Sequence, residues 1–320
     1  MAEALEAFRG AILAALGHAP EAIEPGRLHR FATSERRSDD AGWCKLFDDM
    51  RGGVFGCHRQ GVSETWSAID RTPMTRTHRA ELARQFTAAR AERDAQQRQQ
   101  WAENAQRIAE VWARCLPLTA GDLVTQYLSR RGISAMSPLP EALRSHRGLD
   151  YWHDGKKLGV LPAMVAAIKA PDGRVVALHR TYLMANARKA DVPVVKKVMT
   201  GAAGTLAGAC IRLNLPARGV LGIAEGIETA LAASQAFRMP TVAAYCASAL
   251  AGFLWPAGVQ RLVIFADADK AGREAADTLR VRALAARLHC EVLTPAMEGK
   301  DWCDVWAERG AVMIETGGPA

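Results

Sequence analysis

The carboxyl half of the chain carries acidic residues at the ends of apolar, strand-like runs. These residues are Glu225, Asp267, Asp269, Asp301 and Asp304. Open α/β sheets gather their ligand groups at the carboxyl ends of the strands, so we expect these carboxylates to converge at one sheet edge. Hard oxygen ligands packed closely together need a hard divalent cation to offset their repulsion. The sequence therefore predicts a Mg²⁺ site.

Two strand–turn–helix segments must position these side chains. In the first, residues 220–224 form an apolar strand, Glu225-Gly226 interrupts it, and an apolar helical pattern follows. The glycine is expected to let the backbone turn tightly there. In the second, residues 261–266 form the strand and another helix follows. Asp269 therefore has a second interpretation, as the N-cap of that helix.

Composition indicates a cytoplasmic protein with a polyanionic partner. The 320 residues are 49% hydrophobic, and the formal net charge is +7. Such a charge fits a polyanion, and a merely basic surface is the alternative. The 7 cysteines are scattered, which is typical of reduced thiols. Acidic residues lie near the N-terminus, where a signal peptide would be basic, and no apolar run reaches membrane-spanning length, so we expect no membrane partner.

The first 73 residues have the pattern of a small α/β module. Residues 2–16 show amphipathic helical periodicity, and residues 43–47 and 53–57 have the pattern of strands joined by a turn. Four side chains in this region could ligate a metal: His29, Cys44, Cys57 and His58. They lack the Cys-x₂-Cys spacing of a structural zinc site, so no zinc is expected.

Residues 74–115 form a long helical pattern. One apolar stripe contains Leu82, Phe86 and Ala89, and a second contains Trp101, Ala105, Ile108 and Trp112. Residues 90–100 between them are rich in Arg and Gln. We interpret that segment as a solvated helical connector, with nucleic-acid binding as the alternative.

Cationic residues gather in the next part of the chain. A helix over residues 120–132 closes with a glycine C-cap, and strands over residues 162–168 and 175–183 flank a turn. The second strand and the segment after it carry His179, Arg180, Arg188, Lys189, Lys196 and Lys197. This cluster could track a phosphate backbone, and an ordinary solvated loop is the alternative. Residues 201–208 are glycine-rich but lack the Gly-Lys-Ser/Thr of a phosphate loop, so no motor activity is expected.

Residues 219–306 resemble a Toprim domain, the catalytic module shared by bacterial-type primases, topoisomerases and certain nucleases. The motif residues are Glu225-Gly226, Asp267 and Asp269 followed by Gly272, and Lys300-Asp301. Upstream, residues 127–133, 162–164, 172–182 and 197–201 resemble, in order, the basic subdomain that precedes Toprim in primases. The whole chain is similar to the primase-like Toprim proteins of phages, plasmids and integrative elements, and its N-terminal module carries the least specific part of the likeness.

The resemblance implies an α/β fold with four parts. Residues 1–73 would be a small N-terminal module without a zinc ribbon, and residues 74–116 a helical connector. Residues 117–216 would be a basic α+β primase-type subdomain, and residues 217–320 the Toprim domain, a parallel sheet flanked by helices.

The implied activity is that of a DNA primase, which makes short RNA primers from NTPs on single-stranded DNA and can serve a separate replicative helicase. Asp267, Asp269 and Asp301 would hold Mg²⁺ or Mn²⁺, with Asp304 a further candidate, and Glu225 would join them or act as general acid/base. Template or triphosphate would be held by Arg180, Lys189, Lys196, Lys197, Arg131, Lys270 and Lys300, with Arg174 a lesser candidate.

Two departures from the family pattern leave alternatives open. The zinc ribbon that helps primases choose a template is missing, and Thr229 stands where many primases have an acidic residue, with Glu228 one place earlier. Adjacent helical positions point about 100° apart, so Glu228 cannot be assumed to replace it. A Toprim-type nuclease and a catalytically degenerate nucleic-acid-binding accessory protein are therefore the alternatives. None of the 4 tyrosines lies in a recognisable topoisomerase context.

Overall fold

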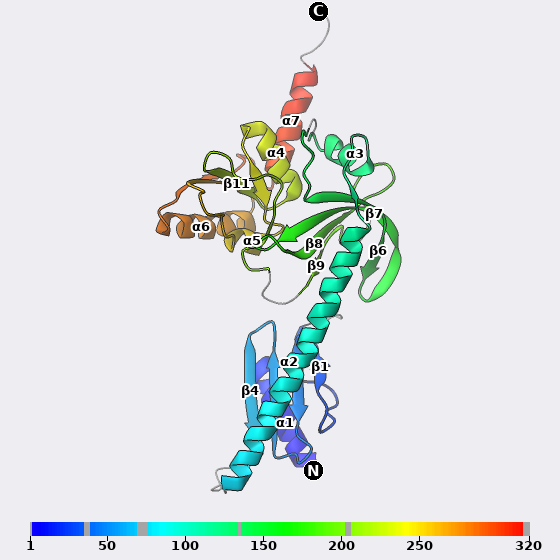
Figure 1. Ribbon diagram of the computed structural model, residues 1–320, viewed down its shortest axis with the longest axis vertical. Coiled ribbons are helices and arrows are strands. Elements are labelled where there is room, and N and C mark those ends of the chain that lie inside the picture. Colours follow the sequence, from blue (N-terminus) through cyan, green and yellow to red (C-terminus); the bar gives the residue numbers. More distant parts are fainter. Residues whose placement is uncertain (1, 35–38, 69–75, 134–135, 202–205, 316–320) are drawn as a thin grey trace, which may run out of the picture. The chain divides into compact units, whose positions relative to one another are not determined.

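The computed structural model describes residues 2–34, 39–68, 76–133, 136–201 and 206–315 and divides the chain into two compact units (Figure 1). Unit 1 comprises Met1–Gln100 with Trp152–Lys157, and unit 2 comprises Trp101–Tyr151 with Leu158–Ala320.

In unit 1 an antiparallel sheet lies between two helices (Figure 1). Its strands pair in sequence order and are β1 (His29–Phe31), β2 (Gly42–Leu46), β3 (Gly52–Cys57) and β4 (Val62–Ser67). Helix α1 (Ala2–Leu16) covers one face, and the first part of α2 (Arg76–Ala113) covers the other. Successive side chains of a strand point to opposite faces. Phe55 therefore packs with α1, whereas the preceding Val54 packs with α2.

The predicted helices of the N-terminal half are confirmed, with one correction. Helix α1 buries Phe8, Ile12 and Leu16, and α2 packs Phe86 and Ala89 against the sheet. In the second stripe of α2, within unit 2, the buried face is centred on Ile108 with Val111 and Trp112 beside it. Ala105 is exposed because it lies about a turn before this contact face. The side chain of Leu82 lies outside the described residues.

Unit 2 is built on one mixed sheet. The strands pair in the order β14–β13–β11–β12–β10–β7–β6–β5, and β8 joins β7 and β9. Their bounds are β5 (Leu116–Pro117), β6 (Leu143–His153), β7 (Lys156–Lys169), β8 (Val175–Tyr182), β9 (Lys196–Thr200), β10 (Cys210–Ile211), β11 (Val220–Ala224), β12 (Thr241–Ala243), β13 (Arg261–Phe265) and β14 (His289–Leu293). The helices are α3 (Leu123–Arg130), α4 (Ile227–Phe237), α5 (Ala247–Ala251), α6 (Lys270–Ala285) and α7 (Trp302–Glu315).

The carboxyl-terminal part of this sheet is parallel, which confirms the α/β class. Strand β11 pairs in parallel with β12 and β13, and β13 pairs in parallel with β14. Helices α4 and α7 pack on one face, where Ala224 and Phe265 point, and α5 and α6 pack on the other, where Ile223 and Ile264 point. All parallel strands thus send their carboxyl ends to the same edge.

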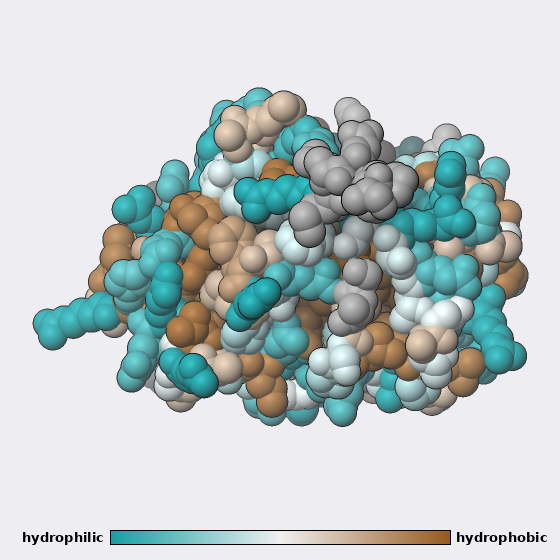
Figure 2. Space-filling view, turned by 90° about the horizontal axis from the view of Figure 1, so that it is seen from above, coloured by the Kyte–Doolittle hydropathy of each residue, from teal (hydrophilic) through white to brown (hydrophobic). Residues whose placement is uncertain are grey.

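Within the described residues, no helix is long and apolar enough to cross a membrane. Figure 2 shows one face of the molecule, on which hydrophilic residues lie interspersed with smaller apolar patches.

Candidate active site

Asp267 and Asp269 lie in the short connection between β13 and α6, at the carboxyl edge of the sheet. The helix begins unusually close to this connection because residue 272 is glycine. A Cβ on Gly272 would lie 2.7 Å from the carbonyl oxygen of Asp267, which the backbone cannot tolerate. Asp269 caps α6, since its Oδ1 accepts a hydrogen bond from the Gly272 N–H at 2.7 Å. The cap interpretation is therefore correct, and it leaves the second carboxylate oxygen of Asp269 for a ligand.

Backbone hydrogen bonds tie this connection to the third acidic segment. The N–H of Ala268 donates to the carbonyl of Lys300 at 2.9 Å, and the N–H of Gly299 donates to the carbonyl of Ala268 at 2.7 Å. The next residue, Asp301, accepts a hydrogen bond from the Asp304 N–H at 2.9 Å at the start of α7. The fold thus fixes Asp301 beside the connection that carries Asp267.

Asp267 is the electrostatic centre of the acidic site. Burial raises the pKa of this carboxyl, and Asp301, Glu225 and Asp269 raise it further, to about 7, against the opposing effect of Lys196. Burial and Asp269 also raise the pKa of Glu225. These couplings act over short distances, so Glu225, Asp269 and Asp301 lie near Asp267, whereas Asp304 is not among its neighbours.

The acidic site fits a divalent cation in its chemistry. The Oδ1 atom of Asp267 is buried and has no hydrogen-bond partner in the part of the chain that the structure describes. A buried carboxylate oxygen without a partner is costly unless a cation neutralises it. As the side chains stand, however, no three Cys, His, Asp or Glu side chains among the described residues are placed to enclose an ion. To hold Mg²⁺ or Mn²⁺, the neighbouring carboxylates would have to rotate toward Asp267, which their mutual repulsion opposes until a cation binds.

Gly226 differs from the sequence prediction. Its φ of −90° is accessible to any residue, so no left-handed turn requires glycine here. A Cβ at this position would instead stand 3.2 Å from Oγ1 of Thr229. The glycine therefore provides space at the first turn of α4.

Glu228 is the main site residue that the sequence analysis did not assign. Its carboxylate is 3% exposed, accepts a hydrogen bond from the Tyr127 hydroxyl at 2.6 Å and pairs with Lys196 Nζ at 2.9 Å. Burial opposes ionisation, but the Lys196 charge and these hydrogen bonds lower the pKa of Glu228 to about 2. The sequence feature that could have identified Glu228 is its position in an apolar helical segment. Residues 227–233 of α4 are all buried, and a single acidic side chain among them needs a partner.

Because Glu228 is held by these two partners, it does not supply the missing acidic ligand at position 229. Thr229 is itself buried. The acidic site therefore has fewer protein carboxylates than the pattern of many primases implies.

The predicted basic cluster divides between the two faces of the sheet. Strands β8 and β9 pair Thr181 with Lys196 and Arg180 with Lys197. Since alternate residues face opposite ways, Lys196 points toward the acidic site, whereas Arg180 and Lys197 share the other face. There Lys197 lies 4.6 Å from the centre of the Tyr151 ring. A single wall containing all these cations is therefore not formed.

His179 carries no charge at neutral pH. It is buried, and burial together with Lys196 lowers the pKa of its imidazole to about 4. The positive charge that the sequence analysis assigned to it is thus missing.

A positively charged cavity of about 510 Å³ lies beside the acidic site. It is lined by Tyr127, Arg130, Arg131, Ala187, Arg188 and Lys189. Burial and the neighbouring Lys196 lower the pKa of Lys189, and Arg131 lowers it further, whereas the carboxylates of Glu228 and Asp301 oppose this shift. These neighbours place Lys189 between the acidic site and the cationic lining of the cavity.

The remaining predicted cations and Asp304 are occupied by other partners. Arg131 pairs with Asp304 at 3.1 Å, which directs Asp304 toward the cavity rather than toward the acidic site. Lys300 pairs with Glu308 of α7. Lys270 pairs with its exposed helical neighbour Glu274 at 3.8 Å. Arg174 pairs with Asp172 in the turn between β7 and β8.

Two family models match consecutive parts of the chain. A family model described as a domain of unknown function, DUF7146, matches residues 102–210, and the Toprim domain model matches residues 220–312. No curated protein sequence matches the chain.

Three solved structures match the chain at low sequence identity. A DNA primase domain from Pseudomonas aeruginosa is 16% identical over 52% of this chain and 55% of its own, with a TM-score of 0.35. The RNA polymerase domain of the Mycobacterium tuberculosis primase DnaG is 17% identical over 68% of this chain and 82% of its own, with a TM-score of 0.39. The Aquifex aeolicus primase, with zinc-binding and RNA polymerase domains, is 16% identical over 98% of this chain and 84% of its own, with a TM-score of 0.38. The chain thus spans about half of the P. aeruginosa domain that it matches.

All three acidic segments, at Glu225, at Asp267 and Asp269, and at Asp301, lie within the range that the second family model matches. Residues 220–312 of this chain are therefore a Toprim domain, as the motifs predict.

Proposed function

We propose that the chain is a DNA primase, a metal-dependent nucleotidyltransferase that copies single-stranded DNA into short primers from NTPs. One observation carries the proposal: the carboxylates around Asp267 lie at the carboxyl edge of the Toprim sheet, beside the cationic cavity at Lys189 and within the same compact unit. An acidic site that could hold a divalent cation, next to a cationic cavity, suits the transfer of nucleotides. We further propose that it serves a phage, plasmid or integrative element and works with a separate replicative helicase.

The residues of the site support distinct roles in this reaction. Bound Mg²⁺ or Mn²⁺ would activate the primer 3′-hydroxyl and neutralise charge on the leaving pyrophosphate. Asp267, Asp269 and Asp301 would hold the cation. The raised pKa of Glu225 makes it a stronger base than an ordinary carboxylate, which suits it to accept the proton of the 3′-hydroxyl. Lys196, which lowers the pKa of both Glu225 and Asp267, offsets part of the negative charge.

The function is tested by primer synthesis on a gel. Labelled and unlabelled single-stranded templates are incubated with Mg²⁺ or Mn²⁺ and with ribonucleotides or deoxyribonucleotides separately. New short oligonucleotides that appear only with nucleotides support a primase, and product with ribonucleotides alone identifies RNA primers. Shortening of the template without nucleotides would instead identify a nuclease.

Two observations favour one further candidate, a nucleic-acid-binding accessory protein with a degenerate site. Among the described residues the carboxylates are not grouped closely enough to enclose an ion, and position 229 carries threonine instead of an acidic residue. Titration with Mn²⁺ followed by calorimetry separates the two. A catalytic site binds the ion through Asp267, so Asp267→Asn abolishes the heat of binding. A degenerate site gives no saturable heat in either protein.

Lys189→Ala is expected to weaken binding of single-stranded DNA or of nucleotide roughly tenfold at about 0.1 M salt, because one phosphate contact is lost. The slope of log affinity against log salt should fall by about one. Arg174→Ala is the matched control, since Arg174 precedes β8 and Lys189 follows it, about 25 Å away along the strand. Equal affinities of the two variants would remove Lys189 from the binding site.

A further inference from the structure

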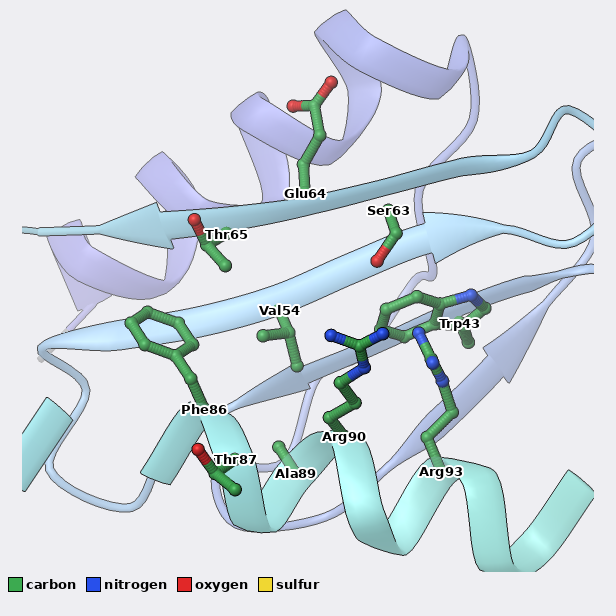
Figure 3. A pocket seen from close by; sticks show the side chains of 10 residues that line it. All are labelled: Trp43, Val54, Ser63, Glu64, Thr65, Phe86, Thr87, Ala89, Arg90 and Arg93. Atoms are coloured by element: carbon green, nitrogen blue, oxygen red, sulfur yellow. The ribbon is translucent and has the colours of Figure 1, made fainter. Parts of the chain in front are cut away.

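Unit 1 contains a second cavity, of about 520 Å³, between α2 and the edge strand β4. Its lining is Trp43, Val54, Ser63, Glu64, Thr65, Phe86, Thr87, Ala89, Arg90 and Arg93 (Figure 3). The floor is apolar, one wall carries guanidinium groups from α2, and the opposite wall carries hydroxyl groups from β4. The toprim chemistry of unit 2 assigns no role to this cavity.

The strand register explains how the floor forms. Trp43 of β2 pairs with Gly56 of β3, which pairs with Ser63 of β4, so these residues share the face beneath α2. A Cβ on Gly56 would lie 2.7 Å from the Trp43 ring, so the indole extends over the glycine toward β4. Ser63 and Thr65 are exposed at the end of these rows, and α2 leaves them uncovered.

The positive charge of the cavity exceeds its local counter-charge. Arg93 lies 4.9 Å from the centre of the Trp43 ring and pairs with Asp94 at 2.6 Å. Arg90 is exposed and forms no hydrogen bond or ion pair within the described ranges. Glu64 is directed to the opposite face of the sheet (Figure 3). Arg30, which faces Trp43 across β1 and β2, extends the cationic strip beyond the cavity.

We propose that this cavity binds single-stranded nucleic acid, with a phosphate at the exposed Arg90 and a base or sugar against the partly exposed Phe86 ring. Trp43 and Val54, which are 3% and 9% exposed, support this surface from below. An exposed guanidinium group beside exposed hydroxyls suits a phosphodiester, and the partly exposed Phe86 ring suits an unstacked base. A duplex keeps its bases inside and would leave the floor unused. The cavity volume lies within the range of small-ligand sites, and a cavity open along an edge strand lets a chain continue past it.

The site is tested with the full chain and a fluorescein-labelled 15-nucleotide single strand, in EDTA and without nucleotides, so that binding does not depend on catalysis. Arg90→Ala is expected to weaken binding roughly five- to tenfold at about 0.1 M salt and to lower the salt slope by about one. Ser63→Glu should weaken it similarly by placing a negative charge on the opposite wall. The control is Arg98→Ala, an exposed arginine two turns farther along α2 that does not line the cavity.

Photocrosslinking locates the site independently of affinity. An oligonucleotide containing 5-iodouracil is expected to attach to the peptide that carries Phe86. The proposal is overturned if Arg90→Ala and Ser63→Glu bind as Arg98→Ala does, if crosslinks fall only in residues 101–320, if a duplex of the same sequence binds as tightly, or if poly-glutamate displaces the strand equally well. Loss of affinity in Arg90→Ala from a chain that makes no primers would leave this site standing and reject the proposed function.

Discussion

Asp267→Asn is expected to abolish primer synthesis and yet to stabilise the metal-free protein. Synthesis should fall by at least about 100-fold, because the amide cannot complete a Mg²⁺ site. In EDTA at pH 8 the free energy of unfolding should rise by about 1–3 kcal/mol, because the substitution removes a buried carboxylate that Asp301, Glu225 and Asp269 repel. The gel assay measures the loss of synthesis, and thermal denaturation in EDTA measures the change in stability. Thermal denaturation with added Mg²⁺ should show stabilisation of the wild type only.

The pH dependence of this effect follows from the raised pKa. In the folded protein the pKa of Asp267 is raised to about 7 from its ordinary value of 3.8, so the folded state holds its proton more tightly than the unfolded state. Stability contributed by this group therefore falls as pH rises from about 4 to about 7, and the advantage of Asp267→Asn appears over the same interval. Mg²⁺ affinity should weaken as pH falls below about 7, because the ion must displace that proton.

Asp277→Asn provides the control, since Asp277 is exposed on α6 outside the acidic site. It should change neither synthesis nor the response to Mg²⁺. Wild-type rates of synthesis in Asp267→Asn would contradict the assignment of the metal site, and a loss of stability in EDTA would contradict the repulsion argument.

Local sequence pattern was sufficient to predict the acidic edge. A parallel strand that ends in an acidic residue places this residue at the carboxyl edge of the sheet, whichever strands lie beside it. Parallel pairing of β11 with β13 then brings the carboxyl ends of these two strands together. The Asp269 cap was predictable for the same reason, because capping depends on residues within one turn.

The basic side of the site depends on pairings that periodicity cannot supply. Lys196 and Lys197 are adjacent in sequence, and only the register of β9 against β8 decides which one faces the carboxylates. Tyr127 and Glu228 form a hydrogen bond although they lie 101 residues apart in the chain, so the local sequence around either residue does not predict the contact. Gly226 illustrates a different limit, since its pattern suggested a turn whereas the structure uses it for space.

Glu228→Gln is expected to destabilise the protein by about 2 kcal/mol near neutral pH and to lower primer synthesis roughly tenfold or more. The amide keeps a contact with Tyr127 but leaves Lys196 without its buried counter-charge, and a charge-assisted hydrogen bond contributes about 1.5–3 kcal/mol. Lys196 would then lose the anchor that holds it beside Glu225 and Asp267. Glu228 thus acts as a positioning residue, and the KM for nucleotide should rise with the fall in rate.

Acid denaturation distinguishes this role from simple packing. The pKa of Glu228 is lowered to about 2 from its ordinary value of 4.5, so its contribution to stability is present above about pH 4.5 and is lost as the pH falls toward 2. Glu228→Gln should flatten the stability profile over that interval. Tyr127→Phe, which keeps the ion pair, should cost only about 1 kcal/mol and preserve synthesis.

Adding Lys196→Met to Glu228→Gln should restore stability without restoring synthesis, because an apolar pair can replace a buried ion pair in the fold but cannot offset the charge at Asp267. Recovery of synthesis in that double variant would show that Lys196 has no part in the reaction.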